Sequence, residues 1–166
     1  MIHKFLVVRA NGAKTALGEY VATVPIVEQL SDPSFRLKVY EWESDGQTFT
    51  RLIDGNETVT ARPLPDGSGI VVLQDADTFG PDNVVVVDAN NEIRQRVSNP
   101  YRVSKFFIAG DNFWFYEIKV DANEIIFKIQ VRRKLAGRPH DAVPIYEASY
   151  DPTSLKFLKL EWRPWT

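Results

Sequence analysis

The chain has 166 residues with 22 Asp and Glu, 20 Lys and Arg, and no Cys, and its formal net charge is −2. This length suits one domain with its own core, so we treat 1–166 as a single unit. The lack of Cys excludes disulfides, thiolate metal sites and Cys nucleophiles and fits a reducing compartment, so we expect a cytoplasmic protein. The longest apolar runs, such as 70–73 and 84–87, fall far short of the ~18 residues that span a bilayer, and residues 1–9 show no secretion signal.

The first predicted strands form a hairpin. Apolar and polar side chains alternate from residue 35, which places Phe35, Leu37 and Val39 on one side of a half-buried strand, with Arg36, Lys38 and Tyr40 on the other. The pair Asp45-Gly46 favours a tight turn, and the β-rich run 48–53 returns after it.

Three later units repeat this design. In each, a β-rich run meets a turn with Asp, Asn or Pro and a second run follows: 84–87 with 92–97, 113–120 with 125–131, and 145–150 with 155–162. In the run 125–131, Ile125, Phe127, Ile129 and Val131 share one face, which is typical of a strand with one wet side.

These patterns predict an all-β fold, an antiparallel sheet built from successive hairpins as a sandwich or small barrel. Only residues 25–30 could form a short turn of helix. Val-Asp-Ala-Asn occurs at 87–90 and again at 120–123, which invites comparison with β-propeller blades. The offset of 33 residues is shorter than the ~40–50 of usual blades, so we favour good turn chemistry used twice.

The small net charge conceals an uneven distribution. Residues 1–93 hold 14 Asp and Glu against 7 Lys and Arg, a net −7, whereas residues 94–166 hold 8 against 13, a net +5. Between residues 41 and 92 there are 11 acids against only Arg51 and Arg62. This segment bears most on the choice of partner, because a face of one sign steers a partner of the opposite sign.

We therefore interpret the acidic segment as a docking surface for a basic protein, with a merely solubilising face as the alternative. The carboxylates would accept hydrogen bonds from Arg and Lys of the partner, and Trp42 would act as an anchor. The expected partner-binding residues are Glu41, Trp42, Glu43, Asp45, Asp54, Glu57, Asp75, Asp77 and Asp82.

In its small size, lack of Cys, lack of a catalytic motif and acidic β surface, the chain resembles the stand-alone immunity proteins that bacteria pair with toxins. The resemblance is one of style and involves no shared motif. It implies a non-enzymatic module that neutralises a basic toxin or nuclease, with no cofactor and no catalytic residues.

Other readings remain open and are less favoured. Asp75, Asp77 and Asp82 resemble half of a calcium loop, but Phe79 and Val86 stand where that loop needs oxygen ligands. A hydrolase could combine loop carboxylates with His140 or a bound metal.

Two further alternatives involve aromatic residues. A carbohydrate-binding or small-ligand domain could stack its ligand on Trp114, Tyr116, Trp162 or Trp165. Nucleic acid could bind the basic run 132–134 and its neighbouring aromatics, although the acidic half would repel it.

Overall fold

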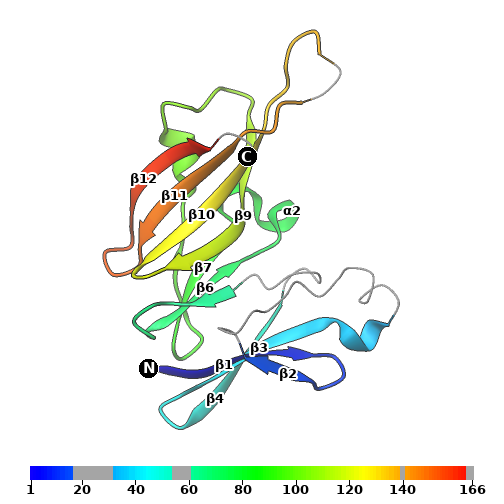
Figure 1. Cartoon of the computed structure of the whole chain (residues 1–166), viewed down its shortest axis with the longest axis vertical. Helices are drawn as coiled ribbons and strands as arrows, with labels where there is room; N and C mark the ends of the chain where they lie inside the picture. Colours follow the sequence, from blue (N-terminus) through cyan, green and yellow to red (C-terminus); the bar gives the residue numbers. More distant parts are fainter. Residues whose placement is uncertain (17–31, 54–60, 139–140, 164–166) are drawn as a thin grey trace.

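The computed structural model describes residues 1–16, 32–53, 61–138 and 141–163, which form three four-stranded antiparallel sheets (Figure 1). In the order of their neighbours, sheet A contains β2 (Lys14–Ala16), β1 (Ile2–Arg9), β3 (Leu37–Ser44) and β4 (Gln47–Leu52). Sheet B contains β5 (Ala61–Pro63), β6 (Gly69–Leu73), β7 (Val84–Asp88) and β8 (Ile93–Arg96). Sheet C contains β12 (Lys156–Arg163), β11 (Ile145–Asp151), β10 (Glu124–Arg132) and β9 (Asn112–Asp121).

Short helical turns connect some of these strands. The turn η1 (Pro33–Phe35) precedes β3, α2 (Ala76–Phe79) and η2 (Gly80–Asp82) join β6 to β7, and η3 (Pro100–Val103) follows β8. In the described part of the chain each sheet is open, with two edge strands, so the all-β antiparallel prediction is confirmed as stacked sheets. No helix among the described residues is long and apolar enough to cross a membrane. The predicted helical turn at 25–30 lies outside the described residues.

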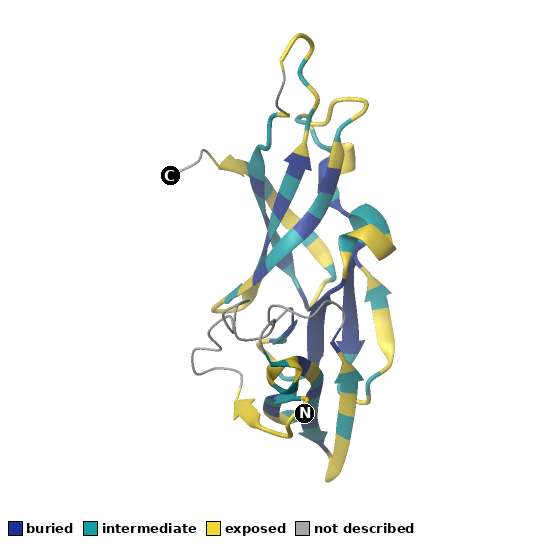
Figure 2. Ribbon diagram, turned by 90° about the vertical axis from the view of Figure 1, so that its right-hand side faces the viewer, coloured by how far each residue is buried: buried dark blue, intermediate teal, exposed yellow. Residues whose placement is uncertain are grey.

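Sheet B is the middle layer, because its two faces belong to two different cores. On β6, Val71 and Leu73 pack with sheet C, whereas Ile70 and Val72 pack with sheet A. The run 84–87 on β7 divides in the same alternating way. A strand buried on both faces must be apolar at every position, which explains the two continuous apolar runs (Figure 2).

The predicted hairpins are confirmed. The strands β3 and β4 are joined by Asp45 and Gly46, whose φ angles of 50° and 77° match the turn that follows the right-handed twist of the strands. The pairs β7 with β8, β9 with β10, and β11 with β12 also form antiparallel hairpins. On β10 the four predicted apolar residues, from Ile125 to Val131, are all buried.

One strand departs from its predicted pattern. The pairing of β1 with β3 skips a residue, because Val8 lies opposite Val39 and Arg9 lies opposite Leu37. Lys38 is therefore the extra residue of a β-bulge, and the alternation reverses beyond it. Tyr40, predicted on the polar side, is fully buried in the core between sheets A and B.

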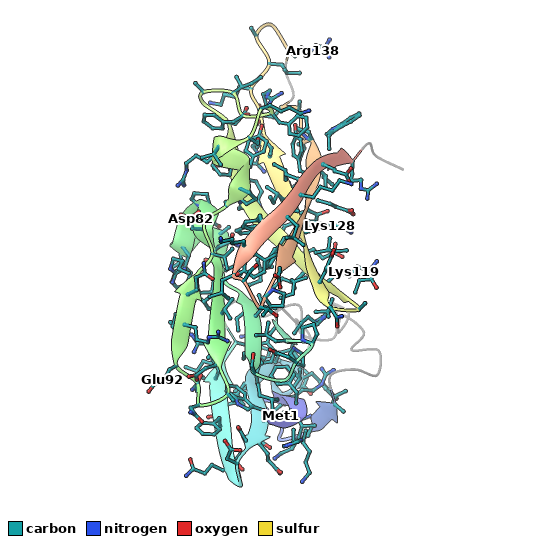
Figure 3. All side chains as sticks on the ribbon, turned by 90° about the vertical axis from the view of Figure 1, so that its left-hand side faces the viewer. Met1, Asp82, Glu92, Lys119, Lys128 and Arg138 are labelled. Atoms are coloured by element: carbon teal, nitrogen blue, oxygen red, sulfur yellow. The ribbon has the colours of Figure 1, made fainter. Side chains whose placement is uncertain are left out.

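The charge asymmetry of the sequence becomes an asymmetry in space. Sheets A and B come from residues 2–96 and sheet C comes from residues 112–163. Figure 3 shows Met1 and Glu92 toward one end of the elongated molecule, Arg138 at the opposite end and Asp82 between them. The end with Met1 and Glu92 thus belongs to the net-negative part of the sequence, and the end with Arg138 belongs to the net-positive part.

Candidate functional site: two charged ends

Three hairpin turns lie toward one end of the molecule, which we call the hairpin end: residues 45–46, 65–68 and 88–92. The start of the chain links two of them, since the backbone N–H of Ile2 donates to the Gly67 carbonyl (2.8 Å) and the amino group of Met1 lies 3.8 Å from Asp45 Oδ1. The third turn docks on sheet A, where Asn91 Nδ2 donates to the Thr50 carbonyl (3.0 Å).

The hairpin end presents carboxylates on rigid turns. Asp66 accepts a hydrogen bond from the Ser68 backbone N–H, and this bond is the main reason that its pKa is lowered. Asp88 accepts from the N–H groups of Asn90 and Glu92 and so fixes the β7–β8 turn. Asp45, Asp66 and Glu92 are exposed. The charge of Arg94 also helps to lower the pKa of Asp66, but no cation among the described residues lies within 4.0 Å of the carboxylates of Asp66 or Glu92.

Two of the predicted carboxylates are largely neutralised. Glu41 and Glu43 share the outer face of sheet A, as their spacing predicts, but Lys14 Nζ lies 2.7 Å from Glu41 and Lys4 Nζ lies 3.0 Å from Glu43. Asp45 keeps a side-chain exposure of 84% beside the chain's amino group. Of these three carboxylates, Asp45 is therefore the one best placed to meet a partner.

Trp42 is not a surface anchor, which corrects the sequence-based expectation. Its side chain has no exposure and packs between the rings of Phe5 and Phe49. Its indole N–H donates to the Ala89 carbonyl at 2.8 Å, which ties sheet A to the β7–β8 turn. The bulge at Lys38 puts Trp42 on the inner face of β3, the same face as Tyr40.

The remaining predicted carboxylates lie elsewhere. Asp75 caps α2, because its carboxylate accepts from the N–H groups of Asp77 and Thr78 and from the Thr78 hydroxyl, which lowers its pKa. Asp82 accepts from the Asn99 N–H and lies 3.7 Å from Arg102. In the described ranges no three His, Cys, Asp or Glu side chains gather as metal ligands would. Asp54, Glu57 and His140 lie outside the described residues.

The opposite end of the molecule is built around a buried polar network. We call this region the loop end: η3, the loop 104–111 and the segment 132–138. Arg133 donates to both carboxylate oxygens of Asp111 at 2.8 Å, and its second terminal nitrogen also donates to the Tyr101 hydroxyl and the Phe106 carbonyl. The Tyr101 hydroxyl donates to Asp111 at 2.7 Å. These bonds fasten the loop to the end of β10.

The network shifts the ionisation of its members. Hydrogen bonds from Arg133 lower the pKa of Asp111 to about 2, whereas hydrogen bonding to Asp111 raises the pKa of Arg133. Burial and the bond to Asp111 raise the pKa of the Tyr101 hydroxyl. The side chain of Asp111 is 1% exposed, so its charge depends on Arg133. Arg133, which belongs to the basic run of the less favoured nucleic-acid alternative, has a structural role in this network.

A pH dependence of stability follows from the lowered pKa of Asp111. The folded state holds the carboxylate ionised down to about pH 2, whereas the unfolded chain protonates it near 3.8, so this contribution is present above pH 4 and is lost as pH falls toward 2. We expect the loss from this group to be about 2 kcal/mol. Urea unfolding of the wild type and of Asp111→Asn at pH 5 and pH 2 measures it. The stability gap between the two proteins should narrow at pH 2, and a constant gap would contradict the assignment.

Exposed apolar side chains lie in the same region as this network, and of these the sequence analysis named only Trp162, as a residue for ligand stacking. Val103 is 88% exposed, Ile108 is 52% exposed and Phe107 is 37% exposed. Trp162 is 53% exposed and pairs with Tyr146, whose ring lies 5.0 Å from that of Tyr101. In the sequence Val103, Phe107 and Ile108 look like ordinary core residues, because only the geometry of η3 and the loop turns them outward.

The aromatic residues suggested for ligand stacking do not form one platform. Trp114 pairs with Gln130 on the outer face of sheet C, with the Arg132 guanidinium 5.7 Å from its ring. Trp162 lies on the other face, opposite Tyr146. Trp165 lies outside the described residues.

The comparisons with known proteins give one informative similarity. No protein-family model matches the chain. No curated protein matches it either. One chain in the structure of Tne2 in complex with Tni2 is similar, with a TM-score of 0.61 and 17% sequence identity, over 99% of this chain and 100% of that chain. At this identity the similarity shows the fold.

Proposed function

We propose that the chain is a non-enzymatic protein-binding module of the immunity or inhibitor type, and that its hairpin end covers a basic site on a toxin or nuclease. The observation that carries this proposal is the gathering of Asp45, Asp66 and Glu92 on three hydrogen-bonded turns at one end of the molecule. Carboxylates held on rigid turns lose little conformational entropy when they meet Arg or Lys of a partner.

Two further observations support this proposal. Among the described residues of 1–93, ten Asp and Glu stand against seven Lys and Arg, and this part of the chain forms the two sheets that bear the hairpin end, so a basic partner would be steered toward them. The similar chain, which covers nearly the whole length, comes from a complex of two proteins, and this supports a protein partner here.

The proposal is tested by removing charge without disturbing the turns. We expect Asp45→Asn/Glu92→Gln to reduce capture of the partner roughly 3- to 10-fold at low salt, because charges at an interface rim act mainly on association. Asn tolerates the positive φ of position 45. The measurement is affinity capture from cells of the source organism, with quantitative mass spectrometry at low and high salt.

A matched variant controls for the change in net charge. Asp121→Asn/Glu124→Gln removes the same two residue types from the β9–β10 turn, where both are exposed. It should leave capture unchanged. If both double variants lose the partner equally, or if neither does, the hairpin end is not the binding site. If no protein is captured at either salt concentration, the proposed function itself fails.

A further inference from the structure

We propose that the loop end is a second docking surface, and that it binds a protein whose own surface combines apolar side chains with carboxylates. This surface is independent of the hairpin end and has the opposite charge. Its apolar part consists of Val103 in η3 and of Phe107 and Ile108 in the loop that follows, together with Trp162 on β12, the strand that contacts η3.

The apolar part is built on a frame that is already ordered. The Phe107 ring packs edge-on against Tyr101 and Phe113, at centroid distances of 6.0 Å. The Ile108 backbone N–H donates to Asp111, and the Ser104 hydroxyl donates to the Tyr101 carbonyl. A partner would therefore meet these side chains in place, without the entropic cost of ordering the loop.

The charge around this apolar part is positive. Residues 98–111 and 132–144 contain six Lys and Arg against two Asp, and one of those acids, Asp111, is buried against Arg133. The exposed cations are Arg102, Lys105, Arg132, Lys134 and Arg138. Exposed apolar and Arg side chains within one region are typical of protein interfaces, and the charge requires carboxylates on the partner.

A protein fits this surface better than nucleic acid does. Bases stack on exposed aromatic rings, but Tyr101 and Phe113 are buried and Phe107 is only 37% exposed. The most exposed residue of the surface is the aliphatic Val103, at 88% against 53% for Trp162. Lys105 and Arg132 already lie over the rings of Phe106 and Trp114, at 5.2 Å and 5.7 Å.

A protein also fits better than a flat bilayer. The segment that includes Lys134 and Arg138 projects beyond the loop 104–111, as Figures 1 and 2 show. The backbone of the loop 104–111 is set back from this segment, so a bilayer would meet the segment that carries Lys134 and Arg138 first. A shaped protein surface can reach past the projecting segment.

The test uses a random 12-residue peptide library displayed on phage and selected on the full chain. We expect the recovered peptides to be rich in Asp, Glu and large apolar residues. Their affinity should fall at least tenfold for Val103→Ser/Ile108→Ser and also for Lys134→Glu/Arg138→Glu, and thermal unfolding should be unchanged because all four side chains are exposed. The matched control Leu52→Ser/Ile93→Ser removes exposed apolar residues elsewhere and should bind normally.

Other outcomes overturn the proposal. Peptides that bind all variants equally, or that are basic, would show that the loop end is not the docking surface. Two other probes are a 20-nucleotide single strand and vesicles of phosphatidylserine and phosphatidylcholine. If either one binds the wild type but not Val103→Ser/Ile108→Ser, the surface is assigned to nucleic acid or to a membrane, respectively. The variant Asp45→Asn/Glu92→Gln should bind these peptides as the wild type does. Failure of the loop-end proposal can therefore be distinguished from failure of the hairpin-end proposal.

Discussion

Replacing Arg133 with Met is expected to lower the free energy of unfolding by about 3–5 kcal/mol. The guanidinium makes two bonds to Asp111 and one each to the Tyr101 hydroxyl and the Phe106 carbonyl. Without it the Asp111 carboxylate, 1% exposed, is left without an ion-pair partner among the described residues. Urea unfolding at pH 7, followed by circular dichroism, measures the change.

The neighbouring residue provides the control. Arg132 is exposed and lies over Trp114, so Arg132→Met should cost less than about 1 kcal/mol. The double variant Arg133→Met/Asp111→Leu should recover part of the loss, because two apolar side chains need no compensating charge. If Arg132→Met and Arg133→Met are equally destabilising, the network does not hold the loop end.

Replacing Trp42 with Ala is expected to cost about 3–5 kcal/mol, since the variant leaves a cavity between sheets A and B. Replacing it with Phe removes mainly the hydrogen bond to the Ala89 carbonyl and should cost about 1–2 kcal/mol. Equilibrium unfolding gives both values. Affinity capture with Trp42→Phe should recover as much partner as the wild type does, because the indole is not at the surface.

Trp162 provides a control for Trp42, because Trp162 is exposed at the surface whereas Trp42 is buried in the core. Trp162→Ala should change the free energy of unfolding by less than about 1 kcal/mol, because half of its side chain is already in water. A Trp42→Phe variant that keeps full stability but loses the partner would mean that Trp42 reaches the surface, contrary to the structure.

The hairpins were predictable because their signals are local. Asp45-Gly46 specifies its turn through two residues that tolerate positive φ, and the alternation along β10 specifies one buried face. The bulge at Lys38 was not predictable, because it depends on how β1 pairs with β3 across 30 or so residues of chain. Trp42 was therefore assigned to the wrong environment.

The stacking of three sheets is reflected in the sequence by two continuous apolar runs, but the alternation of apolar and polar residues does not show how the sheets stack. Residues 70–73 and 84–87 are apolar at every position, as a strand between two layers must be. A run of four apolar residues also fits other buried environments, so the pattern did not indicate which sheets would cover it. The cores in the structure resolve this, with sheet A on one face and sheet C on the other.

The candidate site was predictable in its charge but not in its geometry. Counting acids located the negative half of the chain, yet the pairing of Glu41 with Lys14 and of Glu43 with Lys4 joins residues 27 and 39 positions apart. Asp66, Asp88 and Glu92 could have been singled out, since all three lie in or beside turn sequences rich in Gly, Asn or Ser. The exposure of Val103 and Ile108 depends on the buried network beneath them and has no local signal.

Hydrogen exchange of the backbone amides shows directly whether this chain binds a protein through its hairpin end. The chain would be measured alone and with its captured partner. If the hairpin end is the binding site, exchange should slow on binding at the turns 45–46, 65–68 and 88–92 and should not change at the β9–β10 turn. Slower exchange confined to the outer face of sheet C, or none anywhere, would contradict this proposal.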